Sequence, residues 1–286
     1  MQFNLLNLHD SVDDDNARKL LRVYSILPRF SKIKDGSKAE QAMRVVKFLR
    51  KVNEKLKRDV SPAWKEEWLK AINYNFAKST YRDWFIGRAS VPLIALKRLE
   101  IFGLRKEITE LLNNINYISS TTGEIVKIPK QFNPDLIYLT GLIIGDGSLG
   151  INNRHKENNL LYRIGIHSGD RKFLYLIKPM FETIFEIKHF IVSKYKNNGA
   201  WDLTKNNKAI YRFFTKIIGI QNGKKSHKAL IPGTIKNLVP ENQVAFLAGM
   251  VDSDIGKHSN GMGSTFSSKQ IVIDLVEVLD KLEVKA

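Results

Sequence analysis

Apolar residues recur at helical spacing near the start of the chain. Between residues 39 and 56 they form a single stripe, which predicts an amphipathic helix with one buried face. The stripe is made up of Met43, Val46, Leu49 and Leu56. A second helix is expected over residues 12–27, because three acidic residues near its start suit the positive end of a helix dipole. Residues 12–115 are therefore expected to be helical.

Turn signals divide residues 61–103 into three short helices. Serines that can cap a helix start, and glycines that can end one, follow each other as Ser61, Ser79, Gly87, Ser90 and Gly103. The middle helix carries side chains suited to base edges in a DNA major groove, namely Thr80, Tyr81 and Arg82, with Arg88 just beyond. This segment resembles the recognition helix of repressor-type helix-turn-helix domains. A small helical bundle with a polar outer face would produce the same pattern.

The pattern changes after residue 115. Residues 118–128 alternate and turn at 122–123, which predicts a hairpin. Prolines at 129 and 134 then mark a linker, and beyond it strands and helices mix. The predicted organisation is a helical domain (1–115, with the helix-turn-helix-like segment at 61–103), a hairpin and linker (116–135), and an α+β region.

One segment occurs twice in the α+β region. Leu139–Gly147 (LTGLIIGDG) matches Leu247–Asp254 (LAGMVDSD), with the final aspartates 108 positions apart (254 − 146). Each copy has a glycine, Gly141 or Gly249, inside an apolar helical run, where glycine costs about 1 kcal/mol relative to alanine. A missing side chain lets two helix backbones approach closely. The two glycines are therefore expected at an interface between paired helices.

Pairing of these helices would place Asp146 and Asp254 side by side at one end. Adjacent carboxylates repel each other unless a cation lies between them. Hard oxygen ligands suit Mg²⁺ or Mn²⁺, and such ions can clamp the attacking and leaving oxygens of a phosphodiester. The repeat thus predicts a divalent-metal site for phosphodiester chemistry.

Both copies resemble the nine-residue motif that gives the LAGLIDADG (DOD-type) homing endonucleases their name. The resemblance is to the two-repeat monomeric type and covers residues 127–286. It implies tandem αββαββα repeats, at 136–239 and 240–286, whose motif helices form the interface and whose sheets lie over the major groove. It also implies a monomer with an intramolecular pseudo-dimer that binds double-stranded DNA and hydrolyses both strands with Mg²⁺ or Mn²⁺.

The same resemblance implies roles for individual residues. Asp146 and Asp254 would be the catalytic metal ligands, assisted by the carbonyl of Gly145. The family's Gly-Lys-Ser element is matched by Lys225, or by its neighbour Lys224, which would stabilise charge on the phosphate. Basic residues on or beside the predicted strands are candidate DNA contacts, and they are Arg163, Lys194, Lys196 and Lys205.

The second copy departs from the family pattern in two ways. Ile255 follows Asp254 where the family has a glycine, and a β-branched residue resists the backbone angles that glycine allows. The sequence also ends at Ala286, a point that matches His189 in the first copy. The second repeat is therefore expected to be incomplete, without its second strand pair and closing helix.

Composition agrees with a nucleic-acid partner. The formal net charge is +17, the isoelectric point is near 9.8, and basic residues outnumber acidic ones in both halves of the chain. A well-solvated surface or a ribosome-associated protein would also be basic. The chain has no cysteine, which excludes a disulfide framework, a Cys-ligated zinc finger and a thiol nucleophile. The start of the sequence does not read as a secretory signal, and no apolar run is as long as a membrane span, so a cytoplasmic protein is expected.

Residues 219–226 superficially resemble a phosphate-binding P-loop. That motif requires four residues between its first glycine and its Gly-Lys-Ser/Thr element, whereas three separate Gly219 from Gly223. No nucleotide cofactor is therefore expected.

Together these patterns predict an α+β protein, with an all-α, helix-turn-helix-like domain before two LAGLIDADG repeats. The predicted function is site-specific endonuclease cleavage of double-stranded DNA. Two alternatives stay open, a LAGLIDADG-derived DNA-binding regulator without nuclease activity and an intron RNA maturase. Metal-dependent cleavage distinguishes the first, and a preference for structured RNA over duplex DNA distinguishes the second.

Overall fold

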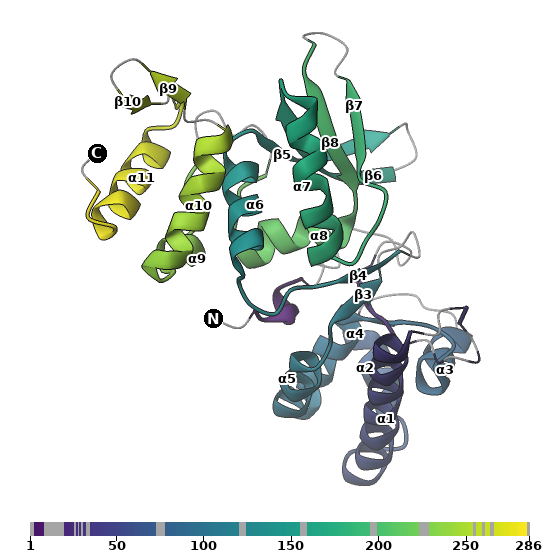
Figure 1. The fold of residues 1–286 in the computed structure, drawn as a ribbon. Coiled ribbons are helices and arrows are strands. Elements are labelled where there is room, and N and C mark those ends of the chain that lie inside the picture. The colour runs from purple at the N-terminus through teal and green to yellow at the C-terminus, as the bar shows by residue number, and fades with distance from the viewer. Residues whose placement is uncertain are drawn as a thin grey trace. The chain divides into compact units, whose positions relative to one another are not determined.

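The computed structural model describes residues 3–8, 20–25, 27, 29, 31–32, 35–72, 78–119, 124–154, 159–194, 199–222, 229–253, 256–258, 261–263 and 266–284. The chain divides into two compact units, Phe3–Ile128 and Pro129–Ala286, which are described separately (Figure 1). Because the boundary follows Ile128, the hairpin predicted at 118–128 belongs to the first unit and not to a linker.

The first unit joins short helices to a small sheet. Its helices are α1 (Gly36–Asp59), α2 (Trp64–Ile72), α3 (Lys78–Ile86), α4 (Leu93–Arg98) and α5 (Arg105–Asn113), with the 3-10 turns η1 (Leu5–Leu8) and η5 (Leu99–Phe102). Its strands are β1 (Arg22–Val23), β2 (Val91–Pro92), β3 (Tyr117–Ser119) and β4 (Ile125–Lys127). They pair antiparallel in the order β2-β1-β3-β4.

The prediction of an all-α first domain is wrong. β1 lies inside the segment 12–27, for which the sequence predicts a helix, and β2 takes the place of the first turn predicted from Val91. Both strands are two residues long and pair with residues far away in the sequence, so no local periodicity marks them. Pro92, which has no backbone N–H to donate, is tolerated because β2 lies at the edge of the sheet.

Helix α1 connects this sheet to the core. The side-chain amide of Gln41 donates hydrogen bonds to the carbonyls of Tyr24 and Tyr117, while its oxygen accepts from the N–H groups of Asn116 and Tyr117. A buried amide that is paired on both sides fixes the position of the helix against the strands.

The predicted apolar stripe of α1 is buried at three of its four positions. Val46, Leu49 and Leu56 are at most 4% exposed, whereas Met43 is 54% exposed. The buried track runs through residues 42, 45–46, 49, 52 and 56, so that Met43 lies one position beside it. Three buried tryptophans pack together in the same unit: Trp64 and Trp68 of α2 stack with ring centres 5.5 Å apart, and Trp84 of α3 meets Trp68 edge-on at 5.8 Å.

The second unit holds a four-stranded antiparallel sheet with helices. The sheet has the order β5-β6-β8-β7, from β5 (Gly147–Arg154), β6 (Asn159–Ser168), β7 (Ile191–Lys194) and β8 (Trp201–Asn206). The helices are α6 (Pro134–Ile144), α7 (Arg171–Ile184), α8 (Lys208–Arg212) with the π-helical segment η6 (Phe213–Ile218), α9 (Gly233–Lys236), α10 (Pro240–Ser253) and α11 (Lys269–Lys281). A two-stranded hairpin of β9 (Gly256–His258) and β10 (Gly261–Gly263) lies between the last two helices in the chain.

The order of elements from α6 to α8 is αββαββα, with α7 covering one face of the sheet (Figure 1). A corresponding order begins again at α10 and runs through the β9–β10 hairpin to α11. The ends of α7 and α11 share an uncommon backbone turn, because Glu186 and Glu283 both adopt a positive φ, of 46° and 58°. The duplication is therefore visible in the backbone well beyond the repeated motif.

Candidate active site between the repeated helices

The two copies of the repeated motif lie on neighbouring helices, α6 and α10 (Figure 1). A Cβ atom added to Gly141 would lie 2.3 Å from the carbonyl oxygen of Phe246, and one added to Gly249 would lie 2.2 Å from the carbonyl oxygen of Tyr138. Cβ atoms do not approach other heavy atoms within 3.0 Å, so glycine is required at both positions. The structure thus places both glycines where the two helix backbones touch.

The contacts at this crossing are equivalent on both sides. Each glycine would meet the residue three positions before, and the residue one position after, the other glycine. These neighbours are Phe246 and Met250 for Gly141, and Tyr138 and Leu142 for Gly249. The helices cross at equivalent points and run in the same direction (Figure 1), so that the residues following each helix emerge on the same side.

The chain turns sharply after α6. Gly145 ends the helix and donates its N–H to the carbonyl of Gly141 at 2.9 Å. The half-buried Asp146 follows, and its carbonyl accepts a hydrogen bond from the N–H of His167 at 3.2 Å. A Cβ on Gly147 would lie 2.4 Å from the Cα of Ile143, so the glycine directly after Asp146 is required by the turn itself.

The described residues include one half of the predicted metal site. Asp146 and Gly145 lie in the described part of the chain, whereas Asp254, Lys225 and Lys224 lie outside it. Within the described residues, no group of three or more His, Cys, Asp or Glu side chains is placed to hold a metal. A carboxylate and the adjacent main-chain carbonyl are hard oxygen donors, so the chemistry of Asp146 and Gly145 fits Mg²⁺ or Mn²⁺.

A polar contact also joins the two helices. The hydroxyl of Tyr138 donates a hydrogen bond to the carboxylate of Asp252 at 2.6 Å. Burial, together with this hydrogen bond to a carboxylate, raises the pKa of Tyr138, so the phenol stays a proton donor. At the equivalent positions on the other side stand Phe246 and Ile144, an apolar pair. The contact therefore distinguishes the two sides of an otherwise symmetric crossing.

A polar cluster lies on the sheet beside Asp146, and of its members the sequence predicts only Arg163 as a site residue. The carboxylate of Asp202, only 3% exposed, pairs with Arg163 at 3.1 Å and with the imidazole of His167 at 2.5 Å. The other ring nitrogen of His167 lies 3.2 Å from the hydroxyl of Ser148. These residues come from β5, β6 and β8 and meet only through the strand register, which no local pattern reveals.

The strand register also separates the predicted DNA contacts. Arg163 shares a face with Asp202 and is about one-third exposed. Lys205 is paired instead with the buried Ile164, and its ammonium donates to the carbonyl of Lys188.

Lys194 lies on the same face as Lys205. Its partner in the register is Trp201, whose ring is covered by the guanidinium of Arg171 from α7 at 4.7 Å. Lys196 lies outside the described residues. Of the described candidates on this sheet, Arg163 is therefore the one on the face that α7 leaves open.

The candidates in the first unit lie on or just after α3. Arg82 and Arg88 are exposed, while Thr80 and Tyr81 are half-buried. The helices predicted before and after Ser79 correspond to α2 and α3, and Gly87 adopts the positive φ of 71° expected at a helix end. Trp84 anchors α3 by its buried ring.

No family model matches this chain, and no curated protein matches it. Among solved structures, mesophilic variants of the homing endonuclease I-DmoI match with 21% identity over 52% of this chain and 77% of theirs, at a TM-score of 0.43. I-DmoI in complex with DNA and Mn matches with 22% identity over 54% of this chain and 81% of that chain, also at 0.43. The meganuclease I-SmaMI bound to uncleavable DNA matches with 17% identity over 53% of this chain and 72% of that chain, at a TM-score of 0.31. With TM-scores below 0.5, these partial likenesses do not establish a family for this chain.

A search of the described residues for membrane-crossing helices finds none with the required length and apolar character.

Proposed function

We propose that this chain is a divalent-metal-dependent DNA endonuclease of the LAGLIDADG type. The observation that supports it most is the crossing of α6 and α10 at Gly141 and Gly249. Duplicated helices that touch at equivalent points bring together the equivalent residues that follow them. In this chain those residues include one aspartate from each copy, Asp146 and Asp254.

In this proposal the paired aspartates hold Mg²⁺ or Mn²⁺, with the carbonyl of Gly145 assisting on the described side. When bound, such an ion activates water and stabilises charge on a scissile phosphate. Lys225 would add a positive charge near that phosphate. Arg163, oriented by the buried Asp202, would bind a neighbouring backbone phosphate from the open face of the sheet.

The proposed substrate is double-stranded DNA. A net charge of +17 supports salt-sensitive binding to a phosphate backbone. In the first unit, the exposed Arg82 and Arg88, with Thr80 and Tyr81 beside them, are proposed to face the duplex from α3. A monomer can supply both motif helices, so the proposed enzyme acts as an intramolecular pseudo-dimer.

A DNA-binding regulator without nuclease activity is the second candidate. Gly147 has no room for a side chain, since its Cβ would meet the backbone of Ile143, yet the equivalent position in the second copy is Ile255. An isoleucine does not fit a turn of the Gly147 geometry, so a second copy that depends on that turn would hold its metal ligand less well. An intron RNA maturase would differ from both by preferring structured RNA.

Incubation of the full chain with a randomised duplex DNA library tests the proposal. We expect specific cuts in Mg²⁺ that are abolished by EDTA and reduced roughly 10³-fold or more by Asp146→Asn, because that change removes a metal ligand. The matched control is Asp135→Asn, which removes the same charge from the exposed first turn of the same helix and should leave cutting intact. Salt-sensitive DNA binding without cuts in Mg²⁺ or Mn²⁺ would instead establish the regulator.

A further inference from the structure

A basic hollow lies within the first unit, between α1, α2 and α3. It has a volume of about 600 Å³, which is in the range of sites for small organic ligands. Its lining includes three cations and three neutral polar side chains, and these are Arg50, Lys65, Arg82, Asn53, Ser79 and Tyr81. No acidic residue lines it.

The three cations have no carboxylate partner in the described part of the chain. Among the residues that the structure describes, neither Arg50, Lys65 nor Arg82 forms an ion pair with a carboxylate. The Nε of Arg50 donates to the carbonyl of Phe85 at 3.2 Å, which orients the guanidinium and leaves its two terminal nitrogens as donors. The hollow therefore concentrates positive charge with donors that suit a phosphate.

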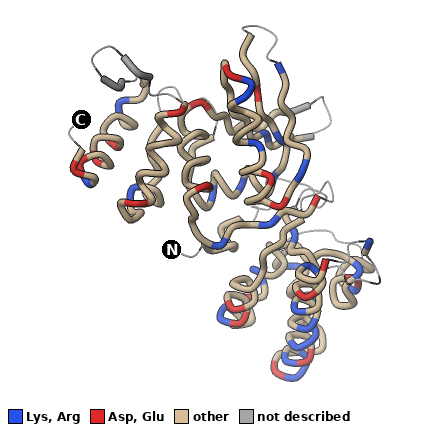
Figure 2. Tube along the Cα trace, in the orientation of Figure 1, with Lys and Arg blue, Asp and Glu red and all other residues tan. Residues whose placement is uncertain are grey.

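A second groove in the same unit provides a comparison. It lies between α1 and α5, has the same volume of about 600 Å³, and is lined by the cations Arg44, Lys47, Lys51 and Lys55. There, however, Glu107 and Glu110 face the cations, and Lys55 pairs with Glu107 at 3.1 Å. Two carboxylates offset part of the positive charge of that groove, whereas no described carboxylate lines the hollow beside α3 (Figure 2 shows the cations along α1).

The ammonium of Lys65 lies against the aromatic rings beside the hollow. It lies 4.7 Å from the ring centre of Phe85 and 5.9 Å from that of Trp64. Burial, with a smaller contribution from the charge of Lys57, lowers the pKa of Lys65. An anion bound in the hollow would relieve both effects.

Asn53 indicates that the ligand is more than a bare phosphate. Its side-chain oxygen is shielded from solvent and has no hydrogen-bond partner within the described residues. Turned toward the hollow, this unpaired acceptor would accept from an N–H or O–H donor of a ligand. A phosphate offers acceptors, whereas the base or sugar of a nucleotide also offers donors, and Tyr81 provides an aromatic ring beside them.

We propose that this hollow binds one phosphorylated nucleotide, with the phosphate among Arg50, Lys65 and Arg82 and a donor of the base or sugar at Asn53. The nucleotide belongs to a nucleic-acid strand or is free, and the chemistry of recognition is the same. The hollow shares Arg82 and Tyr81 with the DNA-binding side proposed above for α3, but the inference requires neither a metal nor cleavage.

The test uses the full-length Asp146→Asn variant in EDTA, so that no cleavage can occur. Lys65 is labelled with an amine-acetylating reagent and followed by mass spectrometry, with exposed Lys47 as the reference. We expect an adenylate single strand to protect Lys65 and not Lys47. Equal protection by adenosine monophosphate would assign the site to free nucleotides. Equal protection by inorganic phosphate alone, or none by any probe, would overturn the proposal.

A matched pair of double variants gives the second readout. Arg50→Gln with Arg82→Gln should weaken binding of the adenylate strand about tenfold or more and reduce the salt slope by about 2. Lys47→Gln with Lys51→Gln removes the same charge from the groove between α1 and α5 and should change the affinity far less. All four side chains are exposed, so both proteins should fold. Equal weakening in the two would mean that general charge alone is at work and would contradict the site.

Discussion

Replacement of Gly249 by alanine should destabilise the second unit by about 3 kcal/mol, the upper end of the usual range for overpacking. The new Cβ would lie 2.2 Å from the carbonyl oxygen of Tyr138, and a backbone atom cannot move without moving its helix. Helix propensity alone predicts the opposite sign, since alanine is favoured over glycine by about 1 kcal/mol. Calorimetry of the full chain should therefore show a lowered unfolding temperature for the second unit. Gly141→Ala should lower it in the same way.

Two comparisons make this prediction specific to the crossing. Gly169→Ala should be within about 0.5 kcal/mol of the parent, because nothing lies within 4 Å of its added Cβ. The double variant of Gly141 and Gly249 should cost less than the sum of the singles, because helices separated by one Cβ also make room for the other. Neutral single variants, or strictly additive ones, would show that the helices do not touch at these glycines.

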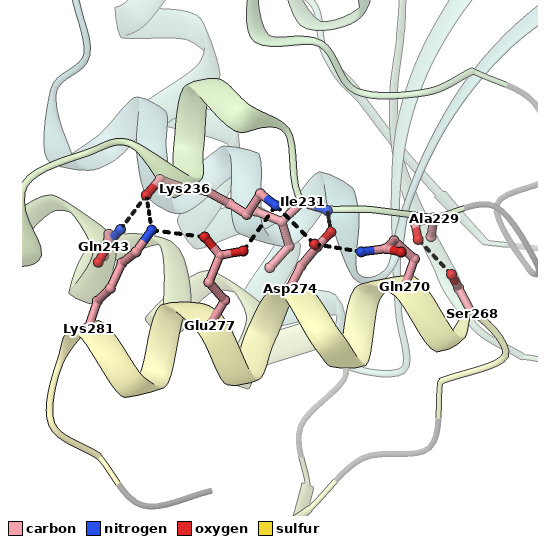
Figure 3. A network of polar contacts seen from close by, with 9 residues as sticks. All are labelled: Ala229, Ile231, Lys236, Gln243, Ser268, Gln270, Asp274, Glu277 and Lys281. Carbon is pink, nitrogen blue, oxygen red and sulfur yellow. Dashed lines mark hydrogen bonds and ion pairs between the residues drawn. The ribbon is translucent and has the colours of Figure 1, made fainter.

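Asp274→Ala should cost about 3 kcal/mol and loosen α11 from the rest of the second unit. Asp274 is 2% exposed and accepts hydrogen bonds from the N–H of Ile231, the ammonium of Lys236 and the amide of Gln270, at 2.8–3.1 Å (Figure 3). Its removal leaves the buried N–H of Ile231 without its acceptor and takes one of two carboxylate partners from Lys236. The value stays at the lower end for a broken buried pair because the Lys236 side chain is 24% exposed.

Glu277→Ala is the matched control on the same helix. Glu277 also pairs with Lys236, at 3.1 Å, but is 44% exposed, so its loss should destabilise the protein far less than the loss of Asp274. Chemical denaturation of the three proteins measures both values. Similar losses for Asp274→Ala and Glu277→Ala would contradict the assignment of Asp274 as the anchor.

The effect of Asp274 should also depend on pH. Burial opposes its charge, but hydrogen bonds from Gln270, Ile231 and Lys236 outweigh burial, and the pKa of the carboxyl is lowered. A lowered pKa in the folded state adds stability that is fully present above the ordinary pKa of aspartate. That stability is lost as the pH falls through the folded-state pKa. The difference between the parent and Asp274→Ala should therefore shrink in acid and stay constant around neutrality.

The duplication made the central helix pair predictable. Gly141 and Gly249 are unfavourable in isolated helices, and their recurrence at the same place in two apolar runs has a simple explanation in close packing. The described structure places both at the contact. Helix α1 and the ends at Gly87 and Gly103 were also predictable, since caps and apolar periodicity act over a few residues.

Features that depend on distant residues were not predictable. β1 and β2 form only by pairing across about 70 residues. Which face of the sheet Arg163 and Lys205 lie on follows from a strand register that one strand alone does not fix. Asp274 in the second copy corresponds to Ile177 in the first, when the copies are aligned on the positive-φ residues Glu186 and Glu283. An aspartate at that position suggests a solvent-facing side chain. In the structure it is buried, because Ile231 and Lys236 supply the hydrogen bonds that its carboxylate needs.

The nuclease proposal depends on one relationship, the closeness of Asp146 and Asp254, and chemical crosslinking measures it directly. The chain has no cysteine, so Asp146→Cys combined with Asp254→Cys introduces the only two thiols. We expect dibromobimane, a short reagent that fluoresces when it joins two thiols, to crosslink this pair efficiently. Asp135→Cys with Asp254→Cys, which uses the opposite end of α6, should not react in this way. Failure to crosslink Cys at 146 and 254, in a protein that stays folded, would contradict a shared metal site between the two repeats.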